Sequence, residues 1–278
     1  MVGGNTRSAI SLRSDIGDCP VAASWSSGGI PSLVDNSTIS TTIGLEWLQQ
    51  AEAEHASIAS FARHTLQLMS IGAPSDLIMR SQEASIDEIE HAKMCYGFAS
   101  EFMGNKIYPG VLDVDGSLEK TDMNVIIESV IRDGCIQETI SAIEGHFRAH
   151  HATDEVIKSS LTKLAADETK HAQLAWDTIK WIVDQYPEYE TVVNKIFAKE
   201  LKKQEKPANK DSGYASTSLC SDPTLESIST RYGIISKDDK EMVRNVGLNK
   251  IIESTYHAGF DDYSLISDRI IELNFHRH

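Results

Sequence analysis

Apolar residues recur every three or four positions along four long stretches of the chain, the spacing that places them on one face of an α-helix. These stretches cover residues 42–70, 75–104, 119–151 and 154–185. Short connections follow the first and third stretches, whereas a longer loop with the turn sequences Pro109-Gly110 and Asp115-Gly116 follows the second. Short, long and short connections are typical of an antiparallel four-helix bundle in which a crossover joins two helical hairpins.

The flanking segments have different patterns. Residues 1–40 are rich in Ser, Gly, Thr and Asn, which predicts an irregular N-terminal arm, and Thr41 and Thr42 can cap the first helix. After the bundle, helical periodicity returns over residues 188–206, 224–231 and 237–258, with a linker-like segment over 207–223. Strand patterns are almost absent. We therefore predict an all-α protein with the bundle over residues 41–186 and a C-terminal helical extension over 187–278 that packs on it.

Composition narrows the functional classes. The 278 residues include 41 acidic and 26 basic side chains, for a formal net charge of −15, which argues against nonspecific binding to nucleic acid or anionic membranes. No apolar run approaches the roughly 18–20 residues that span a bilayer, and the N-terminus lacks the apolar core of a signal peptide. The four cysteines, Cys19, Cys95, Cys135 and Cys220, form no C-x-x-C pair. These features favour a cytoplasmic protein without a zinc ribbon or a disulfide scaffold.

Two glutamates occupy helix faces that are otherwise apolar. On a helical wheel, the residues near Glu54 are Trp47, Ala51, Ile58, Phe61, Thr65 and Met69, and Arg63 lies on the opposite side. The residues near Glu138 are Ile127, Ile131, Gly134, Cys135, Ala142 and Gly145. Both carboxylates therefore point into the core, and the core faces offer no Arg or Lys at that depth. Because a buried carboxylate is costly unless it is paired, two of them on different helices predict a bound cation.

The other two helices each contribute a Glu-x-x-His pair, Glu88 with His91 and Glu168 with His171. Residues three apart are neighbours on a helix face, and both pairs face inward. Such a pair alone is weak evidence, and a third match, Glu52 with His55, is expected to arise by chance. The order is more specific, because 33 residues separate Glu54 from Glu88 and 29 separate Glu138 from Glu168. One hairpin is thus repeated with the same ligand set, which predicts a di-metal carboxylate site.

On these residues the region 42–185 resembles the ferritin-like superfamily of di-iron, and sometimes di-manganese or mixed, carboxylate proteins. The resemblance implies that Glu54 and Glu138 each bind one metal as terminal ligands, that Glu88 and Glu168 bridge the two metals, and that His91 and His171 bind one metal each. It also implies two iron ions, with Mn/Fe or Mn/Mn as alternatives. Oxygen ligands with only two imidazoles suit iron or manganese, whereas a structural zinc would favour cysteine.

Each Glu-x-x-His pair is preceded by an aspartate, Asp87 or Asp167. The resulting sequences resemble the Asp-Glu-x-Arg-His motif of bacterial multicomponent monooxygenases, in which the Asp accepts a hydrogen bond from a ligand histidine on a facing helix. The Arg of that motif is replaced here by Glu90 and Lys170. The sequence from Glu54 to Arg63 also resembles a set of bacterial ferritin-like proteins of unassigned function.

The resemblance implies a non-haem di-iron oxidase or oxygenase that activates dioxygen and oxidises a small organic substrate by hydroxylation, N-oxidation, desaturation or C–C cleavage. In this reading Glu54, Glu88, Glu138 and Glu168 are the catalytic carboxylates. The alternatives are a ferroxidase or iron- or peroxide-handling protein, and a non-catalytic metal-stabilised bundle. No flavin or iron–sulfur motif is visible, so we expect an external electron donor such as a reductase or ferredoxin. A homodimer is compatible with the sequence.

Small residues surround Glu138, among them Gly134, Cys135, Ala142 and Gly145. They either leave space beside the metals for dioxygen and an organic substrate or allow close packing of helices. The sequence does not distinguish these two interpretations.

Overall fold

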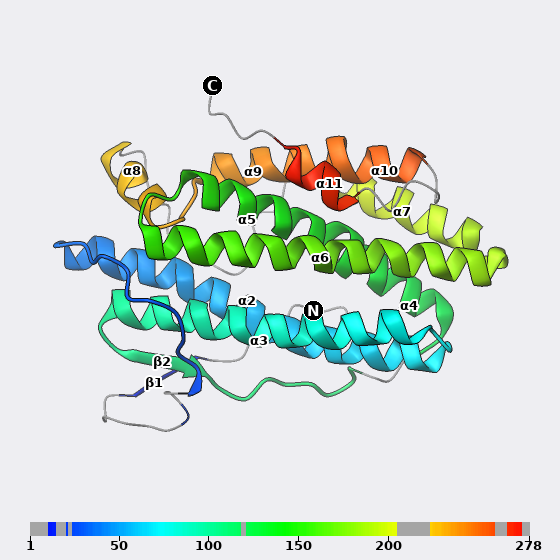
Figure 1. The fold of residues 1–278 in the computed structure, drawn as a ribbon, viewed down its shortest axis with the longest axis horizontal. Coiled ribbons are helices and arrows are strands. Elements are labelled where there is room, and N and C mark those ends of the chain that lie inside the picture. Colours follow the sequence, from blue (N-terminus) through cyan, green and yellow to red (C-terminus); the bar gives the residue numbers. More distant parts are fainter. Residues whose placement is uncertain are drawn as a thin grey trace.

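Two helical hairpins form the centre of the structure (Figure 1). The computed structural model describes residues 11–14, 21, 24–117, 121–204, 223–258 and 266–273. The first hairpin consists of α2 (Ser37–Ser70) and α3 (Ser75–Met103). The second consists of α4 (Met123–Ser129), the π-helical segment η1 (Val130–Glu138) and α5 (Thr139–His151), which follow one another directly, and of α6 (Glu155–Gln185). The two hairpins pack together mainly through α3 and α6, and Arg63 of α2 pairs with Asp133 of η1. The described residues are mostly helical, as the all-α prediction requires.

Side chains with short polar groups set the starts of these helices. Asn36 caps α2 by accepting hydrogen bonds from the backbone N–H groups of Thr38 and Ile39, at 3.1 and 3.2 Å. The helix therefore starts at Ser37, and the expectation that Thr41 and Thr42 form the cap is wrong. Asp154 caps α6 in the same way, through the N–H groups of Val156 and Ile157. At the other end of α3, Gly104 adopts a left-handed φ of 68°, which a glycine tolerates and which ends the helix.

The π-helical segment η1 divides the helix that the periodicity predicts over residues 119–151. The observed helix starts at Met123 with Asp122 as its cap, and residues 118–120 lie outside the described part of the chain. A π-helical turn shifts the side chains that follow it relative to an ordinary α-helix, and such turns occur frequently at functional sites. Here the segment ends at Glu138, one of the predicted ligands.

The C-terminal helices cover the outer face of the second hairpin (Figure 1). They are the 3₁₀ turn η2 (Pro187–Tyr189), α7 (Glu190–Gln204), α8 (Pro223–Arg231), α9 (Lys237–Val246), the π-helical segment η3 (Gly247–Ile252), α10 (Glu253–Ala258) and α11 (Ile266–Ile271). The buried side chains of Val243, Ile251 and Ile270 share one apolar cluster with residues of α5 and α6. Helix α11 is additional to the prediction, and most of the predicted linker, residues 207–222, lies outside the described part of the chain.

A small antiparallel sheet joins the N-terminal region to the loop after α3. Its strands, β1 (Ser11–Ser14) and β2 (Lys106–Pro109), pair with Ser11 opposite Pro109. The sequence pattern missed both strands because four residues are too few to show an alternation of apolar and polar positions. Much of the predicted arm over residues 1–40, including Cys19, lies outside the described residues, as does Cys220.

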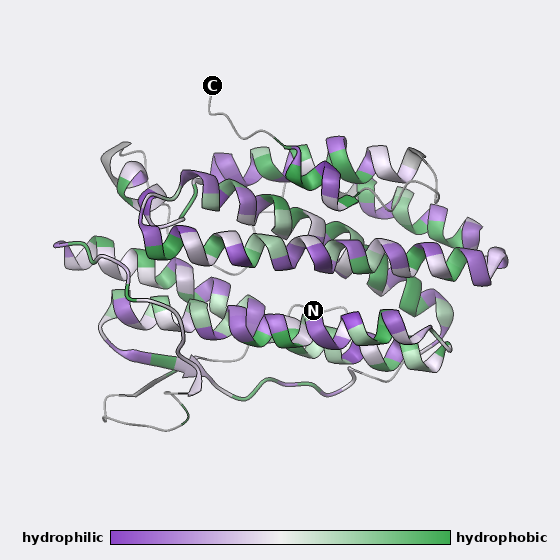
Figure 2. Ribbon diagram, in the orientation of Figure 1, coloured by the Kyte–Doolittle hydropathy of each residue, from purple (hydrophilic) through white to green (hydrophobic). Residues whose placement is uncertain are grey.

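Amphipathic patterning runs along all of the long helices, where hydrophilic and hydrophobic residues alternate around the helix axis (Figure 2). One apolar cluster joins α4, η1, α5 and α6 to the C-terminal helices, and another lies between α2, α3 and the start of α6. No described helix combines the length and the apolarity needed to cross a membrane.

We predict that Gly134→Ala destabilises the fold by about 1–3 kcal/mol, as is typical of overpacking. A Cβ at position 134 would overlap the Cβ of Ala175 on the facing helix α6, and neither backbone can move freely. Urea denaturation should show the loss. The double variant Gly134→Ala with Ala175→Gly removes the overlap, so it should be more stable than the sum of the two single effects predicts. Additive effects would contradict a direct contact at this position.

Candidate metal centre

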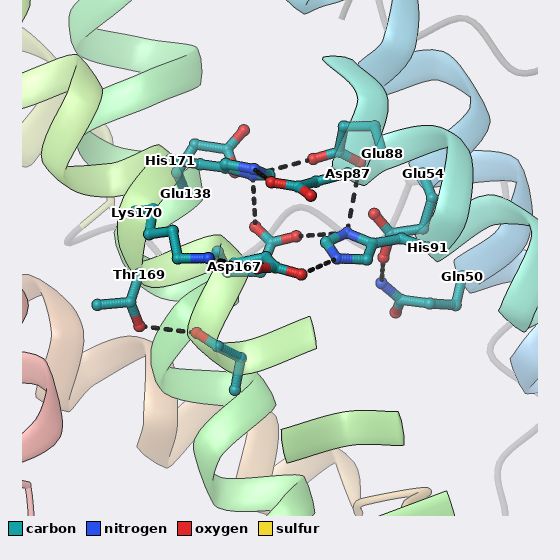
Figure 3. Close-up of polar contacts among 12 residues, drawn as sticks. Gln50, Glu54, Asp87, Glu88, His91, Glu138, Asp167, Thr169, Lys170 and His171 are labelled. Carbon is teal, nitrogen blue, oxygen red and sulfur yellow. Dashed lines mark hydrogen bonds and ion pairs between the residues drawn. The ribbon is translucent and has the colours of Figure 1, made fainter. Parts of the chain in front are cut away.

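Four helical segments bring the six predicted ligands into one buried cluster (Figure 3). Glu54 comes from α2, Glu88 and His91 from α3, Glu138 from the end of η1, and Glu168 and His171 from α6. The ligand atoms form two groups in which all atoms lie within 4.8 Å of one another. These groups consist of Glu54, Glu88, His91 and Glu168, and of Glu88, Glu138, Glu168 and His171. Glu88 and Glu168 belong to both groups, so they lie between two adjacent positions that a metal could occupy.

The Glu-x-x-His spacing gives the cluster an approximate twofold arrangement. Nδ1 of His91 lies 3.4 Å from Glu168 on the facing helix and 4.0 Å from Glu88 on its own helix. Nδ1 of His171 correspondingly lies 3.2 Å from Glu88 and 4.0 Å from Glu168. It also lies 3.9 Å from Glu138. Each imidazole therefore presents the same nitrogen to the carboxylates, as a pair of metal-binding histidines would.

The two aspartates that precede these glutamates contact the opposite histidines. Nε2 of His91 lies 3.4 Å from Asp167 on α6, and Nε2 of His171 lies 3.4 Å from Asp87 on α3 (Figure 3). A carboxylate at Nε2 favours a proton on that nitrogen, which leaves Nδ1 with the lone pair that a metal requires. The side chain of Asp167 is 6% exposed and also pairs with Lys170, whereas that of Asp87 is 30% exposed.

Gln50 and Arg148 form a chain of hydrogen bonds that supports Glu54. The side-chain amide of Gln50, one helical turn before Glu54, donates a hydrogen bond to the carboxylate (Figure 3). The carbonyl of Gln50 in turn accepts a hydrogen bond of 3.2 Å from Arg148 on α5, and the guanidinium of Arg148 lies 5.0 Å from the centre of the Trp47 ring. Sequence reasoning did not identify Gln50 or Arg148, although the spacing of four residues between Gln50 and Glu54 was a usable signal.

Burial makes this cluster of acids unfavourable without a cation. Burial and then the charge of Glu168 raise the pKa values of Glu54, Glu88 and Glu138. Burial alone would favour a neutral His91, but contacts with Asp167 and Glu168 outweigh it and raise the pKa of His91 to about 11. Burial likewise opposes the charge on Glu168, yet the two histidines lower its pKa to about 2. In the absence of metal, protons bound to these side chains therefore supply the positive charge that metal ions would otherwise supply.

The unsatisfied atoms of the cluster fit a metal. Within the described residues, Nδ1 of His91, Nδ1 of His171 and one oxygen of Glu88 are buried without a hydrogen-bond partner. No described Lys or Arg pairs with the four glutamates. The buried Arg63, predicted to lie opposite Glu54, instead pairs with Asp133 at 3.1 Å. Orphaned polar atoms buried side by side are rare unless a ligand satisfies them, and this group of Glu and His side chains could hold a metal ion.

One side of the cluster opens to a pocket with an empty volume of about 410 Å³, the open space at its mouth included. Glu138 and His171 line this pocket together with residues of η1, α2 and α6. The ring of Phe61 packs edge-on against His171, with 5.0 Å between ring centres. The side chain of Glu138 is 16% exposed, whereas Glu54 is sealed at 5%. The two halves of the cluster therefore differ in access.

The small residues near Glu138 serve close helix packing. Gly134 contacts Ala175, and a Cβ at Gly145 would lie 3.0 Å from the Cβ of Ala165, both on α6. Gly134 and Ala175 also line the pocket, so the close approach of η1 to α6 forms part of its wall. The third Glu-x-x-His match lies outside the cluster, since Glu52 accepts a hydrogen bond of 2.6 Å from Ser11 and His55 packs against Trp25.

No protein family, curated protein or solved structure matches this chain. The interpretation of the site therefore depends on its own geometry.

We predict that divalent metal stabilises the protein more at pH 8 than at pH 5.5. Glu54, Glu88, Glu138 and both histidines have raised folded-state pKa values, so the stability they give the metal-free protein is present at low pH and is lost as the pH rises through those values. Metal replaces the protons and is bound best when the ligands are deprotonated. Melting temperatures with metal and with chelator should diverge as pH rises. A constant difference would contradict ligation by these groups.

We also predict that Asp167→Asn weakens metal binding by roughly 10–100-fold, the usual effect of removing a carboxylate that orients a ligand histidine. Asp87→Asn should have a smaller effect because Asp87 is more exposed. Competition against a chelator of known affinity would measure both. Glu90→Gln is a matched control, since Glu90 is an acid in the same sequence motif but pairs with Lys93 at the surface.

Proposed function

We propose that this protein is a non-haem di-iron oxidase or oxygenase with a ferritin-like four-helix architecture, which uses dioxygen to oxidise a small organic substrate. The observation that carries the proposal is the combination of two overlapping ligand groups with a pocket that reaches only one of them. A site that merely stabilised the helices would gain nothing from such access.

The six side chains suit a pair of divalent ions. Glu54 with His91 would hold one ion and Glu138 with His171 the other, with Glu88 and Glu168 shared between them. Four carboxylates balance the charge of two divalent cations, so the loaded core would carry no net charge. When bound, a di-iron pair supplies the electrons for dioxygen activation, which the protein side chains cannot supply themselves.

The two halves of the cluster would have different roles, because the residues around Glu54 and around Glu138 differ. Gln50 donates a hydrogen bond to the carboxylate of Glu54, and Arg148 supports Gln50 in turn. On the other side, Glu138 borders the pocket and its side chain is 16% exposed. Glu138 is thus the carboxylate that can shift to admit a ligand, while Phe61 and Leu174 limit the entry of water. The same geometry favours an oxygenase over a ferroxidase, which needs no pocket with apolar walls.

The remaining partners follow from this chemistry. An external electron donor, such as a reductase or ferredoxin, would have to restore the reduced metals after each turnover. Manganese in one or both positions is compatible with the same ligands. Location in the cytoplasm and homodimer formation stay predictions from the sequence.

We expect anaerobic loading to give two Fe(II) per chain and a single, stoichiometric uptake of dioxygen when air is admitted. Glu138→Gln should lose one iron and most of this uptake, whereas the surface variant Glu90→Gln should behave as wild type. Metal analysis and an oxygen electrode provide the two measurements.

Two other outcomes would contradict the proposal. Continued dioxygen uptake with excess Fe(II), ending in a ferric mineral, would identify a ferroxidase. Tight binding of two metals with no reaction towards dioxygen in the reduced state would leave only a structural role.

A further inference from the structure

The pocket beside Glu138 also contains a guanidinium group, that of Arg63 on α2. Arg63 lines the pocket, yet its side chain is only 8% exposed. One nitrogen, Nη2, donates to Ser129 at 3.2 Å and to Asp133 at 3.1 Å. The buried Nε has no hydrogen-bond acceptor among the described residues. A buried guanidinium with an unpaired donor costs stability, so this arrangement calls for a function.

Asp133 does not need Arg63 as its only counter-ion. Arg132 donates to both of its oxygens, at 2.9 and 3.4 Å, and Ser129 donates to it at 3.2 Å. With these donors and Arg63, the carboxylate has little capacity left for a cationic ligand. Arg63 retains capacity for an acceptor, so the part of the pocket near Arg63 favours an anion over an amine.

The other groups in the pocket do not oppose an anion. Burial, and then the charge of Arg63, lower the pKa of His64 to about 4, so this ring is neutral near pH 7. Glu138 is negative, but it would be neutralised by the metals of the proposed function. The apolar part of the lining comes from Phe61, Val130, Leu174 and Ala175, and Ser60 and Ser129 also line the pocket.

We propose that this pocket binds a small organic acid, whose carboxylate pairs with Arg63 and whose apolar body extends along Phe61 and Leu174 towards Glu138. Arg63, Asp133 and Glu138 line the same pocket, so an acid bound to Arg63 would lie beside the carboxylate of Glu138. This inference rests on the proposed function for the identity of the ligand as substrate, but the binding itself is measured without turnover.

Two acids with matched neutral and cationic analogues test the inference. The probes are hexanoate and 3-phenylpropanoate, each compared with its primary amide, and hexylamine. Binding to the purified protein is measured by calorimetry without dioxygen, so no reaction occurs. We expect each acid to bind at least about tenfold more tightly than its amide, and hexylamine not to compete.

Three variants separate recognition by Arg63 from direct binding to a metal. Arg63→Gln should weaken acid binding at least about tenfold and leave the amides unchanged, and Arg63→Lys should restore part of the affinity. Asp133→Asn should tighten acid binding, because it removes a competing carboxylate. The control Arg80→Gln removes a guanidinium that pairs with Asp177 away from the pocket. We expect the Arg63→Gln variant to fold, because Asp133 keeps Arg132 as an ion-pair partner.

Any one of three results overturns this inference. The first is equal affinity for acids and amides, and the second is unchanged acid binding in Arg63→Gln. The third is no binding of either acid at about 10 mM. Dioxygen uptake without discrimination between acid and amide would retain the proposed function and reject the substrate class. Discrimination between acid and amide without dioxygen uptake would retain the binding of organic acids and reject the proposed function.

Discussion

The burial of four carboxylates in a helical core is the constraint on which the rest of this structure depends. Glu54, Glu88 and Glu168 are almost fully enclosed, and Glu138 is nearly so. Such a group is stable only if positive charge occupies its centre, either as protons and imidazolium or as metal ions. The protein provides no lysine or arginine for this purpose among the described side chains, although Arg63 and Arg148 are buried nearby and pair elsewhere. This selective lack of cationic side chains is the strongest structural argument for metal ions.

The layers around the cluster follow from that constraint. Because imidazole must offer an unprotonated Nδ1, the facing helices place Asp87 and Asp167 at the opposite nitrogen of each ring. Because the two arms of the second hairpin approach closely, glycines replace larger residues where η1 and α5 meet α6. The approximate symmetry ends beyond this layer. Gln50 and Arg148 support Glu54 in one half, whereas in the other half Glu138 borders a pocket that Arg63 also lines. The chemistry we propose depends on this asymmetry.

Much of the fold and the composition of the site could be predicted from local patterns. The bounds of α3 and α6 agree with the periodicity to within a residue, because Pro74 and Gly104 flank α3 and Asp154 caps α6 where the apolar patterns end. The inward direction of Glu54 and Glu138 followed from the wheel, and the structure brings both to the cluster. The wheel was wrong for Arg63, which is buried although it lies on the predicted outer side of α2. The wheel assumes that a helix buries only one face, but near Arg63 a second side of α2 is covered by residues around Asp133.

The sequence by itself determined which side chains form the acid and histidine cluster and which helices carry them, since helical periodicity and three-residue spacing are local properties of the chain. The contacts of Asp87 and Asp167 with the opposite histidines were expected from the resemblance of their motifs, and the structure has them. Only the tertiary structure decided that Gln50 connects Glu54 to Arg148, and that a pocket with Arg63 borders Glu138 and none of the other three glutamates. Those relations join residues about 70 to 100 positions apart in the sequence, and they depend on how helices pack and on the π-helical segment before Glu138, neither of which a local pattern encodes.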